Sequence, residues 1–297
     1  TFNLNIYGNS KAFEYIYDAA GNITEIKLGD QTLYKYSYDV HGRITKELDY
    51  INRKGCTYGY TSTGNVAAKH KKTIDDEGNL KDDTDIKYSY ENNEWADQLT
   101  QYNGQKITYD EVGNPIEYIN GEKFEWTRGR MLSNIIYSND NRISYKYNND
   151  GLRTHKETNE MSVDYEWDEF KLIREVVTYK VTGKKYDIWY FYDGNDEVIG
   201  FEYSQLNDID GSLLKNRIYY EKNKQGDVIG LLDSRGVEIA TYSYDAWGEI
   251  TQKLCYEGNE IPFALNHITY RGYYKDNETG FYYLQSRYYD AEVGRFI

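Results

Sequence analysis

The sequence is poor in cysteine, proline, methionine and histidine, with 2 Cys, 2 Pro, 2 Met and 4 His among 297 residues. Two cysteines cannot build a disulfide scaffold or a cysteine-rich zinc site. We expect Cys56 and Cys255 to be unpaired thiols, and a disulfide between them stays an alternative. No apolar run approaches the roughly 20 residues that a membrane-spanning helix needs. The sequence therefore argues against membrane insertion.

Basic residues are also in deficit, since 35 Lys and Arg stand against 49 Asp and Glu, a formal net charge of −14. A nucleic-acid-binding protein needs basic surface to displace counterions from phosphates. An anionic membrane likewise attracts basic segments. The charge therefore argues against both partners.

Tyrosine is the residue in excess, with 35 Tyr beside 9 Phe, 5 Trp and 25 Gly. Its apolar ring and polar tip suit strands that bury one face of a sheet. Disordered chains are poor in aromatic residues. The composition therefore indicates a folded protein rich in β-strands.

One pattern, aromatic-x-Tyr-Asp-x-x-Gly-x-aliphatic, recurs along the chain, with several copies 21 or 22 residues apart. Repeats of this length indicate units that bury an apolar face only when they are stacked on their neighbours. Clear copies begin at Tyr15, Tyr36, Tyr58, Ile107, Tyr145 and Tyr242, and weaker ones at Tyr88, Phe124, Tyr165 and Tyr190.

Each copy predicts a β-hairpin. Aromatic residues at i and i+2 share one face of a strand, Asp accepts hydrogen bonds from the turn backbone, and Gly supplies the left-handed residue after a type I turn. The predicted fold is all-β, with consecutive antiparallel hairpins in a continuous curling sheet. The residues to which we assign structural turn roles are Tyr17, Asp18, Gly21, Tyr38, Asp39, Gly42, Tyr109, Asp110, Gly113, Tyr147, Gly151, Tyr244, Asp245 and Gly248.

Helical signals are sparse. Segments 91–99 and 260–268 each predict one short helical turn, and 75–85, 193–198 and 205–216 predict longer loops. No Pro- or Ser-rich hinge divides the array, so we expect one continuous domain.

Motifs for catalysis or metal binding are weak. The histidines His41, His70, His155 and His267 have no metal-ligand spacing, and no nucleophile elbow, phosphate-binding loop or His-Glu-x-x-His motif occurs. No catalytic residue, metal or cofactor is predicted.

Two further features have a functional and a structural interpretation. Segments 75–78 and 207–211 partly resemble calcium loops, but Asp-Gly pairs are also common hairpin turns. Trp95 and Trp189 lie outside the repeat frame and are candidates for stacking on sugar rings. The other aromatic residues fit the core of the sheet.

The last 28 residues are the most distinctive part of the chain. Residues 278–284, Glu-Thr-Gly-Phe-Tyr-Tyr-Leu, and 287–296, Arg-Tyr-Tyr-Asp-Ala-Glu-Val-Gly-Arg-Phe, closely resemble the C-terminal core signature of Rhs proteins. The upstream copies resemble the YD repeats of the same family. The signature residues are Gly280, Tyr282, Tyr283, Arg287, Tyr288, Tyr289, Asp290, Gly294, Arg295 and Phe296.

This resemblance implies a segment of a bacterial polymorphic toxin, or of the C component of an ABC toxin. Such proteins form a hollow β-sheet shell around a C-terminal toxin. In that family the signature block plugs or lines the end of the shell. An aspartyl autoprotease follows Gly-Arg-Phe in that family, so protease and toxin would lie beyond Ile297, and further shell repeats before Thr1.

We therefore predict a YD-repeat array over residues 1–269 and a signature block over 270–297. The predicted function is that of a non-enzymatic shell segment, secreted or on the cell surface, which encapsulates and presents a toxin cargo of the same polypeptide. The alternative is an adhesion module that binds carbohydrate or protein at a cell surface.

Overall fold

A computed structural model describes residues 2–6, 9–206 and 211–297. The chain divides into two compact units, Thr1–Ile107 (unit 1) and Thr108–Ile297 (unit 2). The division coincides with an interruption of the hydrogen-bonded ladder between strands β10 and β11. No helix among the described residues combines the length and the apolar character required to cross a bilayer.

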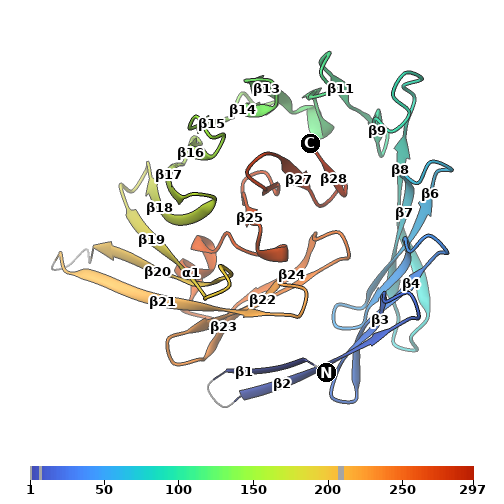
Figure 1. Ribbon diagram of the computed structural model, residues 1–297, viewed down its shortest axis with the longest axis horizontal. Helices are drawn as coiled ribbons and strands as arrows, with labels where there is room; N and C mark the ends of the chain where they lie inside the picture. The colour runs from blue at the N-terminus through green and yellow to red at the C-terminus, as the bar shows by residue number, and fades with distance from the viewer. Residues whose placement is uncertain (1, 7–8, 207–210) are drawn as a thin grey trace. The chain divides into compact units, whose positions relative to one another are not determined.

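Unit 1 is a single 10-stranded sheet in which each strand pairs with the next one in the chain. The neighbouring strands pair in antiparallel fashion, so the sheet is a series of hairpins (Figure 1). Its strands are β1 Phe2–Ile6, β2 Asn9–Tyr17, β3 Ile23–Leu28, β4 Gln31–Tyr38, β5 Ile44–Asp49, β6 Lys54–Tyr60, β7 Val66–Ile74, β8 Leu80–Ser89, β9 Gln101–Tyr102 and β10 Gln105–Lys106.

Unit 2 contains a 14-stranded sheet with the same sequential order, a short helix, and a four-stranded sheet at the C-terminus. The large sheet comprises β11 Thr108–Tyr109, β12 Pro115–Glu117, β13 Lys123–Thr127, β14 Met131–Ile136, β15 Arg142–Tyr147, β16 Arg153–Glu157, β17 Met161–Asp168, β18 Lys171–Tyr179, β19 Lys185–Tyr192, β20 Val198–Leu206, β21 Leu213–Lys222, β22 Val228–Asp233, β23 Glu238–Tyr244 and β24 Ile250–Cys255. The remaining elements are the 3₁₀ turns η1 Ile119–Gly121 and η2 Tyr270–Gly272, helix α1 Glu260–Leu265, and strands β25 Tyr274–Lys275, β26 Tyr282–Tyr283, β27 Tyr288–Asp290 and β28 Arg295–Phe296.

The Asp-to-Gly segment of the repeat forms the predicted hairpin turn. In the first copy the Asp18 carboxylate accepts hydrogen bonds from the backbone N–H groups of Ala20 and Asn22, each at 2.9 Å. The N–H of Gly21 donates to the Asp18 carbonyl at 3.1 Å, and Gly21 has φ +87°. The same left-handed conformation recurs at the turn glycines Gly42 (+75°), Gly113 (+86°), Gly151 (+84°) and Gly248 (+91°).

A β-bulge follows each of these turns, because the register shifts by one residue where the return strand begins. Tyr17 pairs with Ile23 whereas Ile16 pairs with Glu25, and Tyr244 pairs with Ile250 whereas Ser243 pairs with Gln252. A bulge leaves a backbone group without its ladder partner. In these hairpins the group is the carbonyl of the residue that begins the return strand, such as Ile23, and it needs another hydrogen-bond donor.

The second aromatic residue of the following repeat supplies this donor. Tyr38 donates its hydroxyl hydrogen to the carbonyl of Ile23 at 2.8 Å, and Trp126 donates its indole N–H to the carbonyl of Pro115 at 2.6 Å. Only Tyr and Trp combine a large apolar ring with a donor at its far end, which explains why Phe is scarce at this position. The other pairs, at 2.6–2.8 Å, are Tyr60–Ile44, Tyr90–Val66, Tyr147–Leu132, Trp167–Arg153, Tyr192–Leu172 and Tyr244–Val228.

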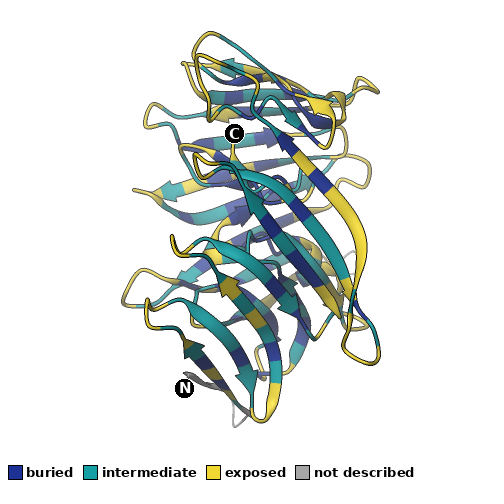
Figure 2. Ribbon diagram, turned by 90° about the vertical axis from the view of Figure 1, so that its right-hand side faces the viewer, coloured by how far each residue is buried: buried dark blue, intermediate teal, exposed yellow. Residues whose placement is uncertain are grey.

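The first aromatic residue of a repeat is buried on the inner face, as Tyr15, Tyr58 and Tyr145 illustrate. Buried and exposed residues alternate along many strands, as Figure 2 shows by colour. The repeat therefore uses its first aromatic ring for packing and its second to join neighbouring hairpins.

The structure corrects two predictions on local structure. Segment 91–99 contains turns and no helix, whereas 260–268 does contain helix α1. The loops predicted at 75–85 and 205–216 are shorter, because β8 begins at Leu80, β20 ends at Leu206 and β21 begins at Leu213. These strand ends are largely exposed on both faces, so they lack the apolar alternation by which a strand is recognised in a sequence.

We expect Tyr244→Phe to lower the free energy of unfolding by about 1–2 kcal/mol, because the buried Val228 carbonyl loses its donor at 2.6 Å. Tyr220→Phe is the matched control: this hydroxyl is also buried, and no described residue is its hydrogen-bond partner. Urea denaturation of both variants checks the prediction. Equal losses in the two variants would contradict the role of the aromatic donor.

Candidate functional site

Residues 270–297, hereafter the C-terminal block, form a compact layer against the large sheet of unit 2. Strands β25 to β28 pair sequentially in a small antiparallel sheet, which lies within the bend of β11–β24 (Figure 1). Gly280 (φ +79°) and Gly294 (φ +77°) take left-handed conformations in its connections. Tyr282, Tyr283 and Tyr288 are among its buried residues.

Hydrogen bonds join the C-terminal block to strands near both ends of the large sheet. Near the beginning of the sheet, Tyr118 donates to Asp290 at 2.9 Å. Near its end, Tyr289 donates to the carbonyl of Trp247 and Tyr282 to that of Gly248, both at 2.7 Å. The block therefore bridges strands that are far apart along the sheet.

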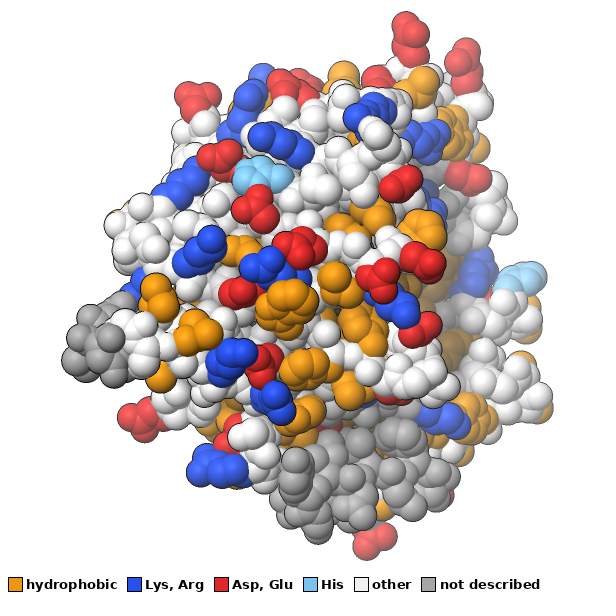
Figure 3. Space-filling view, turned by 60° about the vertical axis from the view of Figure 1, so that its left-hand side comes forward, with side chains coloured by type: hydrophobic (Ala, Val, Ile, Leu, Met, Phe, Trp, Pro, Cys, Tyr) orange, Lys and Arg blue, Asp and Glu red, His pale blue; other side chains and the backbone are white. Residues whose placement is uncertain are grey.

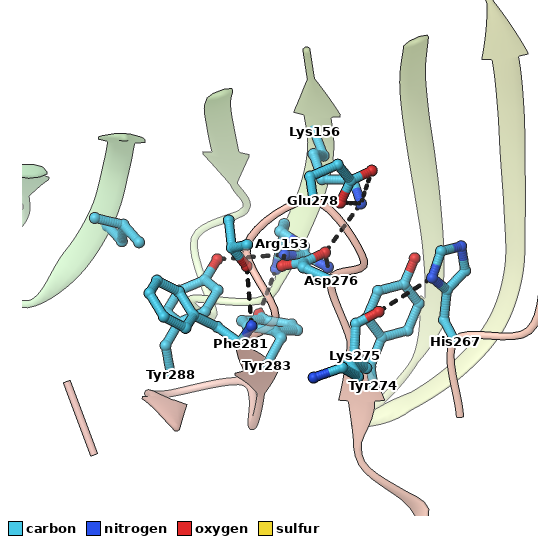
Figure 4. A network of polar contacts seen from close by, with 12 residues as sticks. Arg153, Lys156, His267, Tyr274, Lys275, Asp276, Glu278, Phe281, Tyr283 and Tyr288 are labelled. Carbon is cyan, nitrogen blue, oxygen red and sulfur yellow. Dashed lines mark hydrogen bonds and ion pairs between the residues drawn. The ribbon is translucent and has the colours of Figure 1, made fainter. Parts of the chain in front are cut away.

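A buried ion cluster of Arg153, Lys156, Asp276 and Glu278 fixes the middle of the C-terminal block to strand β16 (Figure 4). Arg153 binds both carboxylate oxygens of Asp276, at 2.5 and 3.0 Å. Lys156 Nζ lies 3.0 Å from Asp276 Oδ1 and 3.0 Å from Glu278 Oε2. The side chains of Arg153, Lys156 and Asp276 are completely buried.

Tyrosine rings surround the guanidinium group of this cluster. The Arg153 Cζ atom lies 4.3 Å from the ring centroid of Tyr283, 4.7 Å from that of Tyr165 and 5.1 Å from that of Tyr274. The Tyr283 hydroxyl also accepts a hydrogen bond from the Arg153 backbone N–H at 2.8 Å. Aromatic faces attract a cation without forming a salt bridge. The rings around the Arg153 guanidinium group therefore come from both the large sheet (Tyr165) and the C-terminal block (Tyr274 and Tyr283).

The charges of the cluster stabilise one another. Burial opposes ionisation of Asp276, but the positive charges of Arg153 and Lys156 outweigh it and lower the pKa of Asp276 to about 2. Burial likewise opposes the charged form of Lys156, yet Asp276 raises the pKa of Lys156 above its usual value. Asp276 and Lys156 therefore stay charged at neutral pH, and loss of the Asp276 charge would leave uncompensated positive charge in the interior.

A second buried carboxylate adjoins the cluster. Glu175 on β18 accepts hydrogen bonds from Tyr190 at 2.6 Å and from Tyr274 at 2.7 Å. His267 stacks on Tyr274 with ring centroids 4.8 Å apart, and its Nδ1 lies 3.1 Å from the Lys275 carbonyl oxygen (Figure 4). These contacts orient Tyr274 toward the sheet, so the arrangement is suited to holding the block in position.

The sequence analysis missed the ion cluster, although the repeat contains a signal for it. Arg153 occupies the position that carries Ile23, Ile44 and Ile250 in other copies. The bulge opposite Tyr147 then places Lys156 on the inner face, three residues later, where the first copy has Ile26. A basic residue at two apolar positions of a repeat indicates a buried ionic partner.

The predicted signature residues fall into a buried and an exposed group. Tyr282, Tyr283, Tyr288 and Asp290 are buried against the sheet, and Tyr289 is half-buried. Arg287 is exposed, with its guanidinium carbon 4.0 Å from the ring centroid of Phe296. Arg295 pairs with Asp290 in the register of β27 and β28. The functional roles of these residues stay a prediction.

The other candidates of the sequence analysis lie apart from this cluster. Asp75 directs one carboxylate oxygen to the backbone N–H of Glu77 and of Asn79, as in the other repeat turns. The second suggested calcium segment, 207–211, lies largely outside the described residues. Cys56 and Cys255 are free thiols.

Both tryptophans proposed for sugar stacking are partly exposed, Trp95 by 47% and Trp189 by 44%. The Arg174 guanidinium carbon lies 5.1 Å from the ring centroid of Trp189. On the side of the molecule drawn in Figure 3, hydrophobic side chains gather among charged ones. The ring of Trp189 is thus partly exposed and lies next to the charged group of Arg174.

Comparisons with known proteins agree with this architecture. The family described as RHS Repeat matches residues 17–50. The tRNA nuclease WapA of Bacillus subtilis (strain 168) is 29% identical over 273 residues, which cover 86% of this chain and 10% of WapA. The double-stranded DNA deaminase toxin A of Burkholderia cenocepacia (strain H111) is 25% identical over 297 residues, which cover 95% of this chain and 20% of that toxin.

The fold is also similar to a solved structure of a Tc holotoxin pore from Photorhabdus luminescens, with a TM-score of 0.52 and 18% sequence identity, over 99% of this chain and 18% of that one. The chain thus spans a tenth to a fifth of the length of these relatives. Its repeats, its sequential antiparallel hairpins and these similarities agree. The chain belongs to the Rhs/YD-repeat family.

Proposed function

We propose that this chain is a shell segment that encapsulates and presents a toxin cargo carried on the C-terminal side of the same polypeptide. One observation carries the proposal: the same segment matches relatives named for different activities, a tRNA nuclease and a double-stranded DNA deaminase toxin. A segment shared by proteins with different chemistries supplies what they have in common. A container for the variable part is such a shared component.

The geometry of unit 2 supports this role. The C-terminal block lies within the bend of the large sheet and is fixed there by the buried ion cluster. A polypeptide that continues from Ile297 would therefore start at a fixed position. Hydrogen bonds from one repeat to the next make the wall a chain of mutually supported hairpins.

We further propose that this segment is not itself catalytic, and that the protein is secreted or displayed on the cell surface. Residues 1–269 would act as the repeat array and 270–297 as the signature block. The turn and signature residues would have structural roles, with the protease and the toxin of the family located beyond Ile297.

The test uses the longer natural gene product. Intact mass, gel filtration and limited proteolysis should reveal a C-terminal fragment that is cleaved from the shell, co-elutes with it and resists added protease. Asp276→Asn in that protein should make the fragment digestible, whereas Asp196→Asn, which removes an exposed ion pair with Lys171, should leave it protected. A freely digested fragment in the unmodified protein would refute encapsulation.

The exposed ring of Trp189 favours a second candidate function, recognition of a cell-surface carbohydrate. Aromatic faces next to charged hydrogen-bonding groups, here Arg174 with Asp187 at 2.7 Å, suit a sugar ring. Binding to a glycan array that Trp189→Ala abolishes and Trp95→Ala leaves intact would support this candidate. Absence of binding would leave encapsulation as the better account.

A further inference from the structure

Asp290 lies at the contact between the C-terminal block and η1, where its carboxylate accepts hydrogen bonds from neutral groups. Its Oδ2 accepts a hydrogen bond from Tyr118 at 2.9 Å, and its Oδ1 accepts one from the Val293 backbone N–H at 3.2 Å. Asp290 as a whole is only 4% exposed to solvent. The carboxyl group is therefore enclosed by both layers, in contrast to Asp276, which two cations neutralise.

The groups that face Asp290 are mainly acidic or neutral. Glu122, which directly follows η1, is half-buried and interacts electrostatically with both Asp290 and Glu292. Lys275 on β25 interacts electrostatically with Asp290, while its amino group donates a hydrogen bond to the Gly280 carbonyl at 2.5 Å. The ionisable groups around the two carboxyls are Tyr118, Glu122, Tyr137, Lys275, Tyr289, Glu292 and, as the register partner of Asp290, Arg295.

Two nearby carboxyl groups withdrawn from water in this way hold their protons more tightly than free side chains do. Burial raises the pKa of Asp290 to about 6. Burial, with the charges of Asp290 and Glu292, raises the pKa of Glu122 to about 7. Both groups therefore change charge between mildly acidic and neutral pH.

We propose that the hydrogen-bonded contact of Asp290 with Tyr118, together with the neighbouring carboxyl of Glu122, is a pH-sensitive latch, which holds the C-terminal block tightly in acid and loosens it toward neutral pH. Its physical basis is independent of the proposed cargo. Under the proposed function, the latch would retain the block in acidic surroundings and allow it to open near neutrality.

The direction follows from proton linkage. When the block separates from η1, water reaches both carboxyls and their pKa values fall toward the usual values of 3.8 and 4.5. Between about pH 4 and pH 7 the docked state therefore binds more protons than the separated state. Docking weakens as the pH rises through that window, and the loss is complete above the raised pKa values.

Other members of the site change charge outside this window. Asp276, with its pKa of about 2, stays ionised above pH 4. Burial lowers the pKa of Lys275 to about 8, so this group changes charge mainly above the window. Any other group that titrates between pH 5 and 7.5 is present in both the wild type and a variant at the latch. Its contribution therefore cancels when the pH dependence of the two proteins is compared.

Hydrogen exchange of the 297-residue chain tests the latch. We expect the opening constant of peptides covering 288–296, corrected for intrinsic exchange, to rise on the order of 100- to 1,000-fold between pH 5.0 and pH 7.5. The raised pKa of Asp290 contributes about 10-fold of this rise and that of Glu122 about 60-fold. The double variant Glu122→Gln/Asp290→Asn should reduce this rise to less than about threefold. Glu111→Gln, which removes an exposed carboxylate in a nearby turn, should keep the full rise.

Two results would overturn the proposal: a corrected opening constant that does not change with pH in the wild type, or a full rise in the double variant. If Asp290→Asn prevents folding, Glu122→Gln alone decides, because its half-buried side chain tolerates the change. The Glu122→Gln variant must then show a severalfold smaller rise of the opening constant between pH 5.0 and pH 7.5. The outcome is independent of encapsulation, since the cargo plays no part in the measurement.

Discussion

Replacement of Asp276 by asparagine is expected to lower the free energy of unfolding of unit 2 by about 3–5 kcal/mol. Asparagine keeps the size of the side chain but removes the negative charge between Arg153 and Lys156, both completely buried. Removal of one partner of a buried ion pair leaves an uncompensated charge in a medium of low polarity. Urea denaturation, followed by hydrogen exchange of unit 2 peptides, measures the loss.

Asp196→Asn is the control for Asp276→Asn, because Asp196 is exposed and pairs at 2.5 Å with Lys171, which is itself only half-buried. Exposed ion pairs contribute about 0–1 kcal/mol. If both variants lose the same amount, the buried cluster does not anchor the C-terminal block. A large loss in Asp276→Asn, with exchange increased first in residues 270–297, would establish that it does.

The same cluster gives a stability change in strong acid that is opposite in direction to that of the latch. The pKa of Asp276 is lowered to about 2 in the fold, against a usual value of 3.8. Its contribution is therefore fully present above about pH 4 and is lost as the pH falls toward 2. The contact between the block and the large sheet thus contains one carboxyl, Asp276, that stabilises it when ionised, whereas the proposed latch adds two, Asp290 and Glu122, that stabilise it when protonated.

The hairpin architecture could be predicted from the sequence because each repeat contains its own turn chemistry. Asp18 and Gly21 alone specify a turn, and the aromatic residues before them specify which face of the strand is buried. The all-β fold of consecutive antiparallel hairpins is confirmed. The interruption after Ile107 was not foreseen, since no Pro- or Ser-rich segment marks it.

The hydrogen bond that the second aromatic residue donates to the preceding hairpin could not be predicted from the sequence. A repeat shows that Tyr38 and Trp126 occupy equivalent positions, but the acceptor is a backbone carbonyl freed by a bulge in the preceding hairpin. A bulge shifts the register by one residue, and the sequence does not display it. The preference for Tyr or Trp over Phe was visible, but its cause was not.

The ion cluster shows where sequence reasoning stops. Asp276 and Glu278 stand in the distinctive C-terminal segment, yet 49 acidic residues offer no means of telling a buried carboxylate from an exposed one. The basic partners lie 120 or more positions away in the chain. The informative signals were Arg153 and Lys156, basic residues at positions that are aliphatic in the first copy, and they become visible only when the repeats are aligned beyond the turn glycine.

The second large effect is expected at Gly248, where Gly248→Ala should lower the free energy of unfolding by about 2–4 kcal/mol. Its φ of +91° already disfavours a side chain, which costs about 1 kcal/mol. A Cβ atom would also lie 2.4 Å from Cδ1 and 2.7 Å from Cγ of Tyr270. Cγ is at the base of the ring, so relief of the clash requires displacement of Tyr270 as a whole.

Gly226→Ala separates these two causes, because Gly226 has φ +87° in another repeat turn and its Cβ would meet nothing within 4 Å. We expect this control to lose only the conformational part, about 1 kcal/mol. Thermal or urea unfolding of both variants gives the difference, which measures the packing of Tyr270 on the turn. The carbonyl of Gly248 accepts the hydroxyl of Tyr282 at 2.7 Å, so a shift of this turn moves a contact of the C-terminal block. A Gly248→Ala variant as stable as Gly226→Ala would show that the block adapts to the turn, whereas the larger loss would show that turn and block are packed as one structure.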